Sequence, residues 1–434
     1  MPHELDQILV LSSTPGWHAR LREIHAAVKQ ATYFEDGSIE EGDLNKIIQN
    51  VKRCKNTALQ EYTKKFDDIT LPTSEFRISE EDLEKAHKEI DKNLLKSIRK
   101  AIKNVRKYQT EIFIGSRKTC RGIRYTPIKR VGICVPGASA PLPSTVIMTA
   151  VPAQVAGVKE IAVVSPPRYK GSIHPTILAV CKELKITEVY RIGGAQAVAA
   201  LAFGTETINF VDKIVGPGNR WVQMAKRKVF GSVDIDSVAG PSEVLVIADD
   251  KANPAWVAAD MLSQAEHAPG SAIVFTDSQK FAENVLEELE KQVSRLGRSE
   301  ETLECLKKFG AIIVFENTDE IITQANFFAP EHLEIQCGDK SRKIADKIEN
   351  AGAIFIGDYS PVAVGDYWAG PSHTLPTGRT ARFFSALSAN DFIKSISIIE
   401  YSKKQLAESA GDIIRLAEAE GLDAHAKSVK IRIE

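Results

Sequence analysis

The chain has 434 residues, of which 43% are hydrophobic and 26% are charged, and 56 lysines and arginines against 57 aspartates and glutamates leave a net charge of −1. This composition is typical of a globular protein and excludes intrinsic disorder and fibrous architecture. At about 150 residues per domain, the length predicts two or three domains. Because nucleic-acid binding usually needs a basic surplus on one face, the balanced charge argues against nucleic acid as a partner.

The sequence predicts neither export nor a membrane anchor. Charged residues occur throughout the first 30 positions, so the apolar core of a secretory signal is missing. The most apolar long stretch, 143–158, contains Pro152 and Gln154 and is shorter than the ~20 residues that span a bilayer. Six cysteines without a CxxC pair favour reduced thiols in a cytoplasmic protein: Cys54, Cys120, Cys134, Cys181, Cys305 and Cys337.

The predicted elements change in character along the chain. Residues 37–109 are charged, and apolar positions spaced by three and four, as in 82–105, predict amphipathic helices. From Arg130 onward, short β-rich runs bounded by Gly or Pro alternate with helical stretches. The predicted strands of this series are 131–135, 160–165, 188–192 and 213–215.

A second series of strands and helices follows Gly240. Its predicted strands are 243–248, 271–276, 311–315, 333–336 and 353–356. Strands that alternate with helices predict parallel sheets covered on both faces, hence an α/β fold with two such units side by side. The tail after Phe383 is charged and predicted to be helical over 389–420. It is too short for a domain, so we expect it to dock on another surface, such as another subunit.

Three turns between a strand and a helix in the first series are rich in small residues: 135–139, 192–196 and 215–219. Glycine at such a turn lets the backbone and the helix N-terminus approach an anionic ligand, which suits a nucleotide. None of the turns has the GxGxxG pattern. Glycine required only for backbone conformation is an equally good explanation of each turn taken alone.

Potential metal ligands and acid–base groups occur near the second series. Gln264 and His267 are spaced to share one helix face and hold one ion, and Glu331-His332 places two acid–base groups side by side before a strand. Further polar residues follow at Asp366, His373, Glu420 and His425. Their mixed nitrogen and oxygen set suits zinc and is poor for iron–sulfur chemistry. Each group alone is more often ordinary protein surface.

Several segments together resemble the histidinol dehydrogenase family, in order from about residue 20 to the end of the chain. These segments are 193–204 (GGAQAVAALAFG), 214–219 (IVGPGN), 239–249 (AGPSEVLVIAD), 262–267 (LSQAEH), 330–336 (PEHLEIQ), 364–367 (VGDY), 373–377 (HTLPT) and 421–425 (GLDAH). The resemblance implies a four-electron oxidation of L-histidinol through L-histidinaldehyde to L-histidine. This reaction consumes two NAD⁺ and is the last step of histidine biosynthesis.

The resemblance also implies roles for individual residues. His332 matches the base that takes the hydroxyl proton, and Glu331 matches the base that activates water for the second oxidation. One zinc ion per site is expected on Gln264, His267, Asp366 and His425 of the partner subunit, where it orients the substrate. The expected substrate contacts are Ser242, Gln264, His267, His332, Asp366, His373, Glu420 and His425, and the expected NAD contacts are Cys134, Gln196 and Asn219.

The resemblance further implies an intertwined homodimer built from two incomplete Rossmann-like domains and small helical ends. The expected parts are an N-terminal helical arm (1–30), a first Rossmann-like domain with the zinc and catalytic residues (31–129 plus 240–383), a second with the NAD turns (130–239), and a C-terminal helical tail on the partner subunit (384–434). Cys134 departs from the tyrosine frequent in the family, and Ala138 from a second glycine. We expect activity with altered NAD affinity.

Two other functions compete with this interpretation. The first is a related zinc- and NAD-dependent enzyme that oxidises sulfopropanediol or a related amino alcohol, against which Glu420 and the HTLPT segment argue. The second is a catalytically silent zinc-binding or scaffold protein, against which the intact Glu331-His332 pair argues. Formation of NADH from L-histidinol distinguishes all three.

Overall fold

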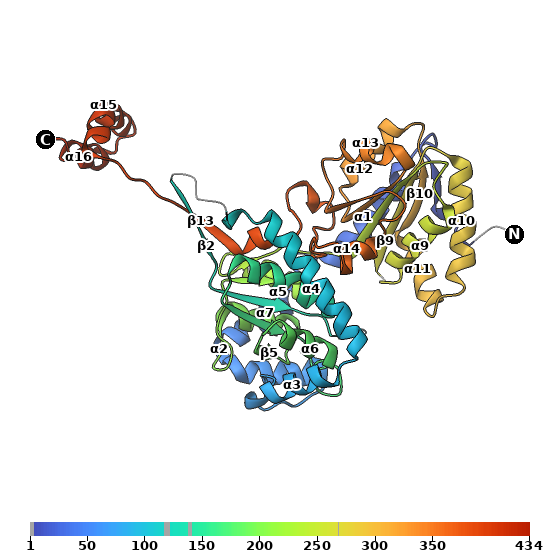
Figure 1. Cartoon of the computed structure of the whole chain (residues 1–434), viewed down its shortest axis with the longest axis horizontal. Coiled ribbons are helices and arrows are strands. Elements are labelled where there is room, and N and C mark those ends of the chain that lie inside the picture. Colours follow the sequence, from blue (N-terminus) through green and yellow to red (C-terminus); the bar gives the residue numbers. More distant parts are fainter. Residues whose placement is uncertain (1–3, 117–121, 138–140, 268) are drawn as a thin grey trace. The chain divides into compact units, whose positions relative to one another are not determined.

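Figure 1 shows the computed structural model of the chain, which describes residues 4–116, 122–137, 141–267 and 269–434. The chain forms two compact units. The first contains Met1–Phe113 and Pro127–Phe392, and the second contains Ile114–Thr126 and Ile393–Glu434. The predicted α/β architecture with parallel sheets is confirmed in the first unit, which carries both large sheets.

One sheet of the first unit has six strands within the described ranges, in the order β1-β10-β9-β8-β11-β12, and all neighbours are parallel. They are β1 (Leu9–Leu11), β8 (Ser242–Ala248), β9 (Gly270–Thr276), β10 (Gly310–Val314), β11 (His332–Gln336) and β12 (Ala353–Ile356). The central strands are continuous runs of buried residues, as expected for a parallel sheet with both faces covered.

The other large sheet has five parallel strands among the described residues, in the order β5-β4-β3-β6-β7. They are β3 (Arg130–Cys134), β4 (Glu160–Val164), β5 (Glu188–Tyr190), β6 (Lys213–Val215) and β7 (Asp234–Ile235). Both sheets follow one plan: the chain adds strands on one side of a central strand, β3 or β8, and then returns to its other side with β6 or β11. All nine predicted strands are present, whereas β1 and β7 were not predicted.

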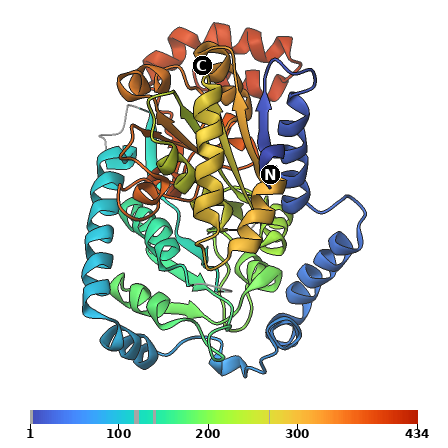
Figure 2. The same ribbon diagram turned by 90° about the vertical axis from the view of Figure 1, so that its right-hand side faces the viewer.

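Helices cover both sheets of the first unit (Figure 2). They are α1 (His18–Thr32), α2 (Ile39–Asp67), α3 (Glu80–Glu89), α4 (Lys92–Ile112), α5 (Pro143–Ala156), α6 (Pro175–Glu183), α7 (Gly194–Phe203), α8 (Arg220–Val229), α9 (Pro254–Ala265), α10 (Gln279–Val293), α11 (Ser299–Phe309), α12 (Thr318–Phe328), α13 (Ser341–Ala345) and α14 (Val362–Tyr367). Short 3₁₀ turns lie at Asp6–Ile8, Thr73–Glu75, Gly338–Lys340, Thr380–Arg382 and Ala389–Phe392.

The amphipathic helices of the N-terminal third pack on helices of the five-stranded sheet. Helix α2 contacts α7, α3 contacts α6, and α4 lies along α5 (Figure 1). In α4 the buried residues Ile98, Val105 and Gln109 share one helix face, as the sequence pattern predicts, and Asp91 caps the N-terminus by accepting from the amide of Leu94. The segment 82–105, whose spacing predicts amphipathic helix, is divided between α3 and α4. The expected domain boundaries stay a prediction.

The second unit corrects the expectation of a continuous helix over 389–420. Residues Ile393–Ser397 form strand β13, which pairs with β2 (Ile123–Pro127), and the 3₁₀ turn Ile114–Ser116 belongs to the same unit. Helices α15 (Lys403–Ala419) and α16 (Asp423–Lys430) then pack against each other. The sequence pattern missed β13 because only one of its residues is even partly buried, so it lacks the alternation that marks a strand.

Among the described residues no helix is long and apolar enough to cross a membrane. Five of the six cysteines are described, and four of them are free thiols: Cys54, Cys134, Cys181 and Cys337. The fifth, Cys305, donates its thiol hydrogen to the Gly270 carbonyl at 3.2 Å. Cys120 lies outside the described residues.

Candidate active site

A cavity of about 200 Å³ lies where the amino ends of β8 and β11 meet the turn that follows β6. Side chains named by the sequence analysis contribute much of its lining: Ser242, Gln264, His267, Glu331, His332, Asp366 and His373. These residues are up to 131 positions apart in sequence, since they run from 242 to 373. Ligands of open parallel sheets usually bind at the carboxyl ends of strands. The six-stranded sheet departs from that rule because its amino ends line this cavity.

Glu331 and His332 are buried, each with 5% of its surface exposed. Helix α12 ends at Ala329 in a left-handed conformation, Pro330 follows, and β11 begins at His332. The main chain of Glu243 on neighbouring β8 holds both side chains. Its amide donates to Glu331 Oε2 at 2.8 Å, and its carbonyl oxygen lies 2.9 Å from His332 Nδ1.

The contact with the Glu243 carbonyl determines which nitrogen of His332 carries the proton. A carbonyl oxygen only accepts, so Nδ1 carries the hydrogen and donates it. Burial lowers the pKa of His332 to about 4, which keeps the ring neutral. Nε2 is therefore a free acceptor; it has no hydrogen-bond partner among the described residues and lies 3.9 Å from Asp366 Oδ1. This nitrogen is suited to take a proton from a ligand in the cavity.

Burial shifts the pKa of Glu331 in the opposite direction to that of His332. Its pKa is raised well above the usual value, first by burial and further by the charges of Glu243 and Asp366. The hydrogen bond from the Glu243 amide opposes this shift but does not cancel it. A bound cation near the carboxyl group would favour its ionised form. The two adjacent side chains thus present a nitrogen base and a carboxyl group of very different proton affinity.

Three of the four expected metal ligands line this cavity. Gln264 lies in the last turn of α9 with 3% of its surface exposed, and His267 follows the helix end, where its amide donates to the Gln264 carbonyl at 3.3 Å. Asp366 lies in α14, and burial raises its pKa to about 6. Within the described ranges no group of three or more His, Cys, Asp or Glu side chains is arranged to hold a metal ion.

The residues present nevertheless fit a zinc ion chemically. The side-chain amide nitrogen of Gln264 is buried and has no hydrogen-bond partner among the described residues. No hydrogen bond at that atom therefore fixes the orientation of the amide, which leaves the group available to a ligand. One amide, one imidazole and one carboxylate that line the same cavity form a mixed oxygen and nitrogen donor set, which zinc accepts.

His373 and Ser242 complete the predicted residues of this cavity. His373 Nε2 lies 3.3 Å from Oγ of Ser144, a residue of α5 that the sequence analysis did not single out. Burial lowers the pKa of His373 to about 4. Ser242 begins β8 and is hydrogen-bonded to Glu331 through its side chain. Ser144 lacked any sequence signal because its contact depends on packing between the two α/β halves of the unit.

Glu420 and His425 belong to the second unit. Glu420 ends helix α15 and His425 lies in α16, and both residues are exposed. Ala138, noted above for its departure from a glycine, lies outside the described residues.

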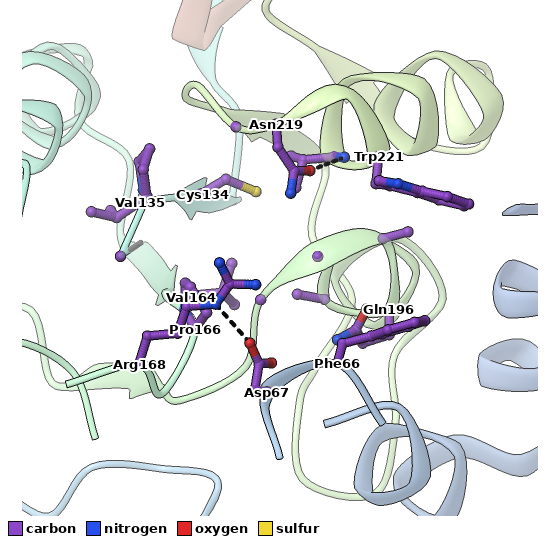
Figure 3. Close-up of a pocket in the computed structure, with 18 of the residues that line it drawn as sticks. Phe66, Asp67, Cys134, Val135, Val164, Pro166, Arg168, Gln196, Asn219 and Trp221 are labelled. Atoms are coloured by element: carbon purple, nitrogen blue, oxygen red, sulfur yellow. Dashed lines mark hydrogen bonds and ion pairs between the residues drawn. The ribbon is translucent and has the colours of Figure 1, made fainter. Parts of the chain in front are cut away.

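A second cavity, of about 280 Å³, lies at the carboxyl ends of the five-stranded sheet (Figure 3). All three expected NAD contacts line it: Cys134 ends β3, Gln196 lies in the first turn of α7, and Asn219 precedes α8. Burial raises the pKa of the Cys134 thiol to about 12, so it stays neutral. Gln196 Oε1 is buried without a partner among the described residues and is free to bind a ligand donor.

The rim of the second cavity carries residues that the sequence analysis missed. Figure 3 shows Phe66 and Trp221 on its aromatic side and the ion pair between Arg168 Nε and Asp67 Oδ1, whose atoms are 2.9 Å apart. Asn219 also has a structural task, because its side chain caps α8 by accepting from the amide of Val222 at 3.1 Å.

The turn formed by Gly216, Pro217 and Gly218 separates the two cavities, since Pro217 lines both. The buried ion pair of Lys226 and Asp236 fixes the backbone of this turn at Gly216. Lys226 Nζ donates to the Gly216 carbonyl at 3.0 Å, and the Gly216 amide donates to Asp236 Oδ2 at 2.7 Å. Two ligands, one bound in each cavity, would therefore lie on opposite sides of this turn.

Comparison with known proteins identifies the family. A sequence model for histidinol dehydrogenase matches residues 32–433. The histidinol dehydrogenase of Caldanaerobacter subterraneus subsp. tengcongensis is 51% identical over 395 residues, which cover 89% of this chain and 91% of that protein. The chain belongs to the histidinol dehydrogenase family. The enzyme of Rhodopirellula baltica is 49% identical over 397 residues, 89% of this chain and 85% of that protein.

A solved structure agrees with this assignment over the full length. The crystal structure of histidinol dehydrogenase from Elizabethkingia anophelis covers 100% of this chain and 99% of its own, with a TM-score of 0.90 at 35% sequence identity. The predicted family is therefore confirmed. Histidinol dehydrogenases are NAD-dependent oxidoreductases that carry out the final step of histidine biosynthesis, with histidinol as their small-molecule substrate, and they are generally zinc-dependent.

Proposed function

We propose that this member of the histidinol dehydrogenase family oxidises L-histidinol twice at the same carbon, through L-histidinaldehyde to L-histidine, with two NAD⁺. The observation that carries the proposal is the pairing of two residues that line the smaller cavity: a neutral His332, whose Nε2 has no hydrogen-bond partner in the part of the chain that the structure describes, and Glu331 beside it. Both oxidations can then proceed on one bound substrate, and the reactive aldehyde does not leave the site.

In the first oxidation, His332 Nε2 takes the hydroxyl proton as hydride leaves the carbinol carbon for NAD⁺. The Glu243 carbonyl stabilises the protonated imidazole because it keeps its hydrogen bond from Nδ1 throughout. In the second oxidation, the Glu331 carboxylate takes a proton from water as the water adds to the aldehyde carbon, and the oxygen of the aldehyde takes the proton that His332 held. The hydrate then loses hydride to the second NAD⁺ and a hydroxyl proton to His332, which leaves the carboxylic acid. Adjacent bases on one strand end reach the same carbon in both steps.

We assign the zinc ion to Gln264, His267, Asp366 and the partner subunit's His425. These residues would hold the ion, which would help to orient the substrate in the cavity. Ser242, His373 and the partner subunit's Glu420 are proposed as further substrate contacts, and the carboxylate of Glu420 suits a cationic amino alcohol.

We place NAD in the larger cavity, with Cys134, Gln196 and Asn219 among its contacts. The support is that all three line one cavity at the carboxyl ends of the five-stranded sheet, beside the point where its strand order reverses. The nicotinamide would then approach the substrate across the Gly216–Gly218 turn. A small thiol at Cys134 leaves more room than the tyrosine frequent in the family, so NAD affinity should differ.

We further propose an intertwined homodimer of two incomplete Rossmann-like domains per chain, with the C-terminal tail docking on the partner. The tail forms a small unit of its own with many exposed apolar side chains, among them Ile399, Leu416 and Ile431. An unaccompanied unit of this size rarely buries enough apolar surface to be stable. A cytoplasmic location remains part of this proposal.

The decisive experiment measures NADH formed per L-histidinol consumed, with limiting L-histidinol and excess NAD⁺. Two NADH per substrate are expected. A yield of one with free aldehyde accumulating would refute the proposal, and turnover of sulfopropanediol in preference to L-histidinol would favour the related enzyme instead. Absence of any NADH would favour the catalytically silent protein.

A further inference from the structure

Three polar side chains, Glu334, Gln336 and the partly buried Asp260, form a hydrogen-bonded cluster that lines neither of the two cavities described above. Glu334, on β11 two residues after His332, is 1% exposed. Its Oε1 accepts from the amide of Val362 at 2.8 Å, and its Oε2 accepts from Gln336 Nε2 at 3.1 Å. The same Gln336 nitrogen donates to Asp260 Oδ2 at 2.7 Å, and the carboxyl groups of Glu334 and Asp260 are themselves hydrogen-bonded.

The two carboxyl groups hold one proton between them. Burial, together with the charge of Asp260, raises the pKa of Glu334 to about 9. Burial also raises the pKa of Asp260, but the hydrogen bonds from Glu334 and Gln336 oppose this shift and favour the ionised form of Asp260. Two adjacent buried carboxylates would repel each other strongly, so one of them keeps its proton. Glu334 is accordingly the protonated partner, and its hydroxyl donates to Asp260.

This cluster joins the two elements that carry the three proposed ligands of the first unit. Asp260 lies in α9, one helical turn before Gln264, and α9 also leads to His267. Val362 begins α14, which carries Asp366. The hydrogen bonds therefore run from α9 through β11 to the start of α14.

Helix α14 depends on this contact more than a longer helix would. It has only six residues, and Pro361 before it provides no side-chain cap. Val362 is its one buried residue, and Tyr367 and Trp368 at its end are about half exposed, at 57% and 47%. With so little packing, the bond from the Val362 amide to Glu334 is a main restraint on the position of Asp366.

We propose that Glu334, acting with Asp260, is a positioning residue for the metal: it holds α14 against α9 so that Asp366 and Gln264 can bind one ion. This inference rests on the metal site proposed above. It predicts that tight metal binding requires a side chain at position 334 that can form these hydrogen bonds, and that it does not require a negative charge there.

The test compares the affinity of purified, metal-free variants for zinc alone, measured by competition with a chromophoric chelator. Glu334→Ala should weaken zinc binding by about tenfold or more, as observed when partners that orient metal ligands are removed. Glu334→Gln should lose far less zinc affinity than Glu334→Ala, because its amide oxygen accepts from Val362 and its N–H donates to Asp260, although the bond from Gln336 to residue 334 is lost. Asp249→Asn is a matched control, since Asp249 is also buried but lies beyond the opposite end of β8 and should not affect zinc affinity.

Three results would overturn the positioning role: unchanged affinity in Glu334→Ala, an equal loss in Glu334→Gln and Glu334→Ala, or an equal loss in Asp249→Asn. Glu334→Asp provides a second measurement if Glu334→Ala does not fold, because the shorter side chain withdraws its carboxyl group from Val362. Wild-type affinity in that variant would likewise overturn the inference. Gln264→Ala distinguishes an error in the proposed metal site from an error in the positioning role. If it leaves zinc affinity unchanged, the metal site itself is wrong; if it abolishes binding while Glu334→Ala does not, only the positioning role is wrong.

Discussion

Replacement of Gly216 by alanine should damage the turn between the two cavities by a predictable amount. Gly216 has a φ of +106°, and a Cβ atom there would lie 2.3 Å from the backbone oxygen of Cys134 and 3.2 Å from its nitrogen. Cys134 cannot withdraw easily, because it ends β3, which pairs with strands on both sides. The turn is held from its other side by Lys226 and Asp236, through hydrogen bonds to the carbonyl and amide of Gly216.

The expected loss of stability has two parts. A positive φ costs an L-residue about 1–2 kcal/mol, and overpacking against a fixed backbone costs about 1–3 kcal/mol, so Gly216→Ala should lower the free energy of unfolding by about 2–5 kcal/mol. Gly231→Ala is the matched control, because Gly231 has a φ of +96° and nothing within 4 Å of its Cβ position. It should lose only the first part.

Denaturant unfolding of both variants and their KM for NAD⁺ provide the assay. Gly216→Ala should unfold at a lower denaturant midpoint than Gly231→Ala. Its KM for NAD⁺ should rise, because Pro217 and Gly218 of the same turn line the proposed NAD cavity, whereas Gly231→Ala should keep the wild-type KM. Equal midpoints together with an unchanged KM in Gly216→Ala would refute both the rigidity of the turn and its role in cofactor binding.

Three further predictions concern histidines and their partners. His332→Asn should slow the first oxidation by about 10²-fold or more, and Glu331→Gln should leave aldehyde formation but block the second oxidation; quenched-flow product analysis distinguishes them, and normal turnover in both would contradict these roles. Mixed dimers of His425→Ala and His267→Ala subunits should recover roughly half of the activity per dimer, because one site is then intact; confirmed heterodimers that stay inactive would exclude a shared site. Burial lowers the pKa of His25 from 6.5 to about 4, so the unfolded chain binds the extra proton first and stability falls as pH decreases from 6.5 towards 4. His25→Phe should reduce that slope in urea unfolding measured across this range, and an identical slope would show that His25 does not contribute.

The sequence by itself determined the class of fold and most of the chemistry. Continuous apolar runs such as 243–248 predict buried parallel strands, because a strand covered on both faces has no polar side, and every predicted strand is present. The adjacency of Glu331 and His332 is a property of the chain alone, and so are the long motifs that identify the family. Local spacing predicted that Gln264 and His267 share one helix face, but α9 ends at Ala265, so His267 lies in the turn beyond the helix and reaches the cavity from there.

Only the tertiary structure decided how these residues are oriented. The tautomer of His332 depends on the carbonyl of Glu243, which is 89 positions away and carries no sequence signal of such a role. The use of the amino ends of β8 and β11 likewise follows from how the two sheets pack. The strand β13 was missed because it is almost entirely exposed and has no apolar alternation, so only its pairing with the distant β2 identifies it. Periodicity reports how one segment is buried, whereas orientation and pairing depend on contacts between distant segments, which exist only once the chain has folded.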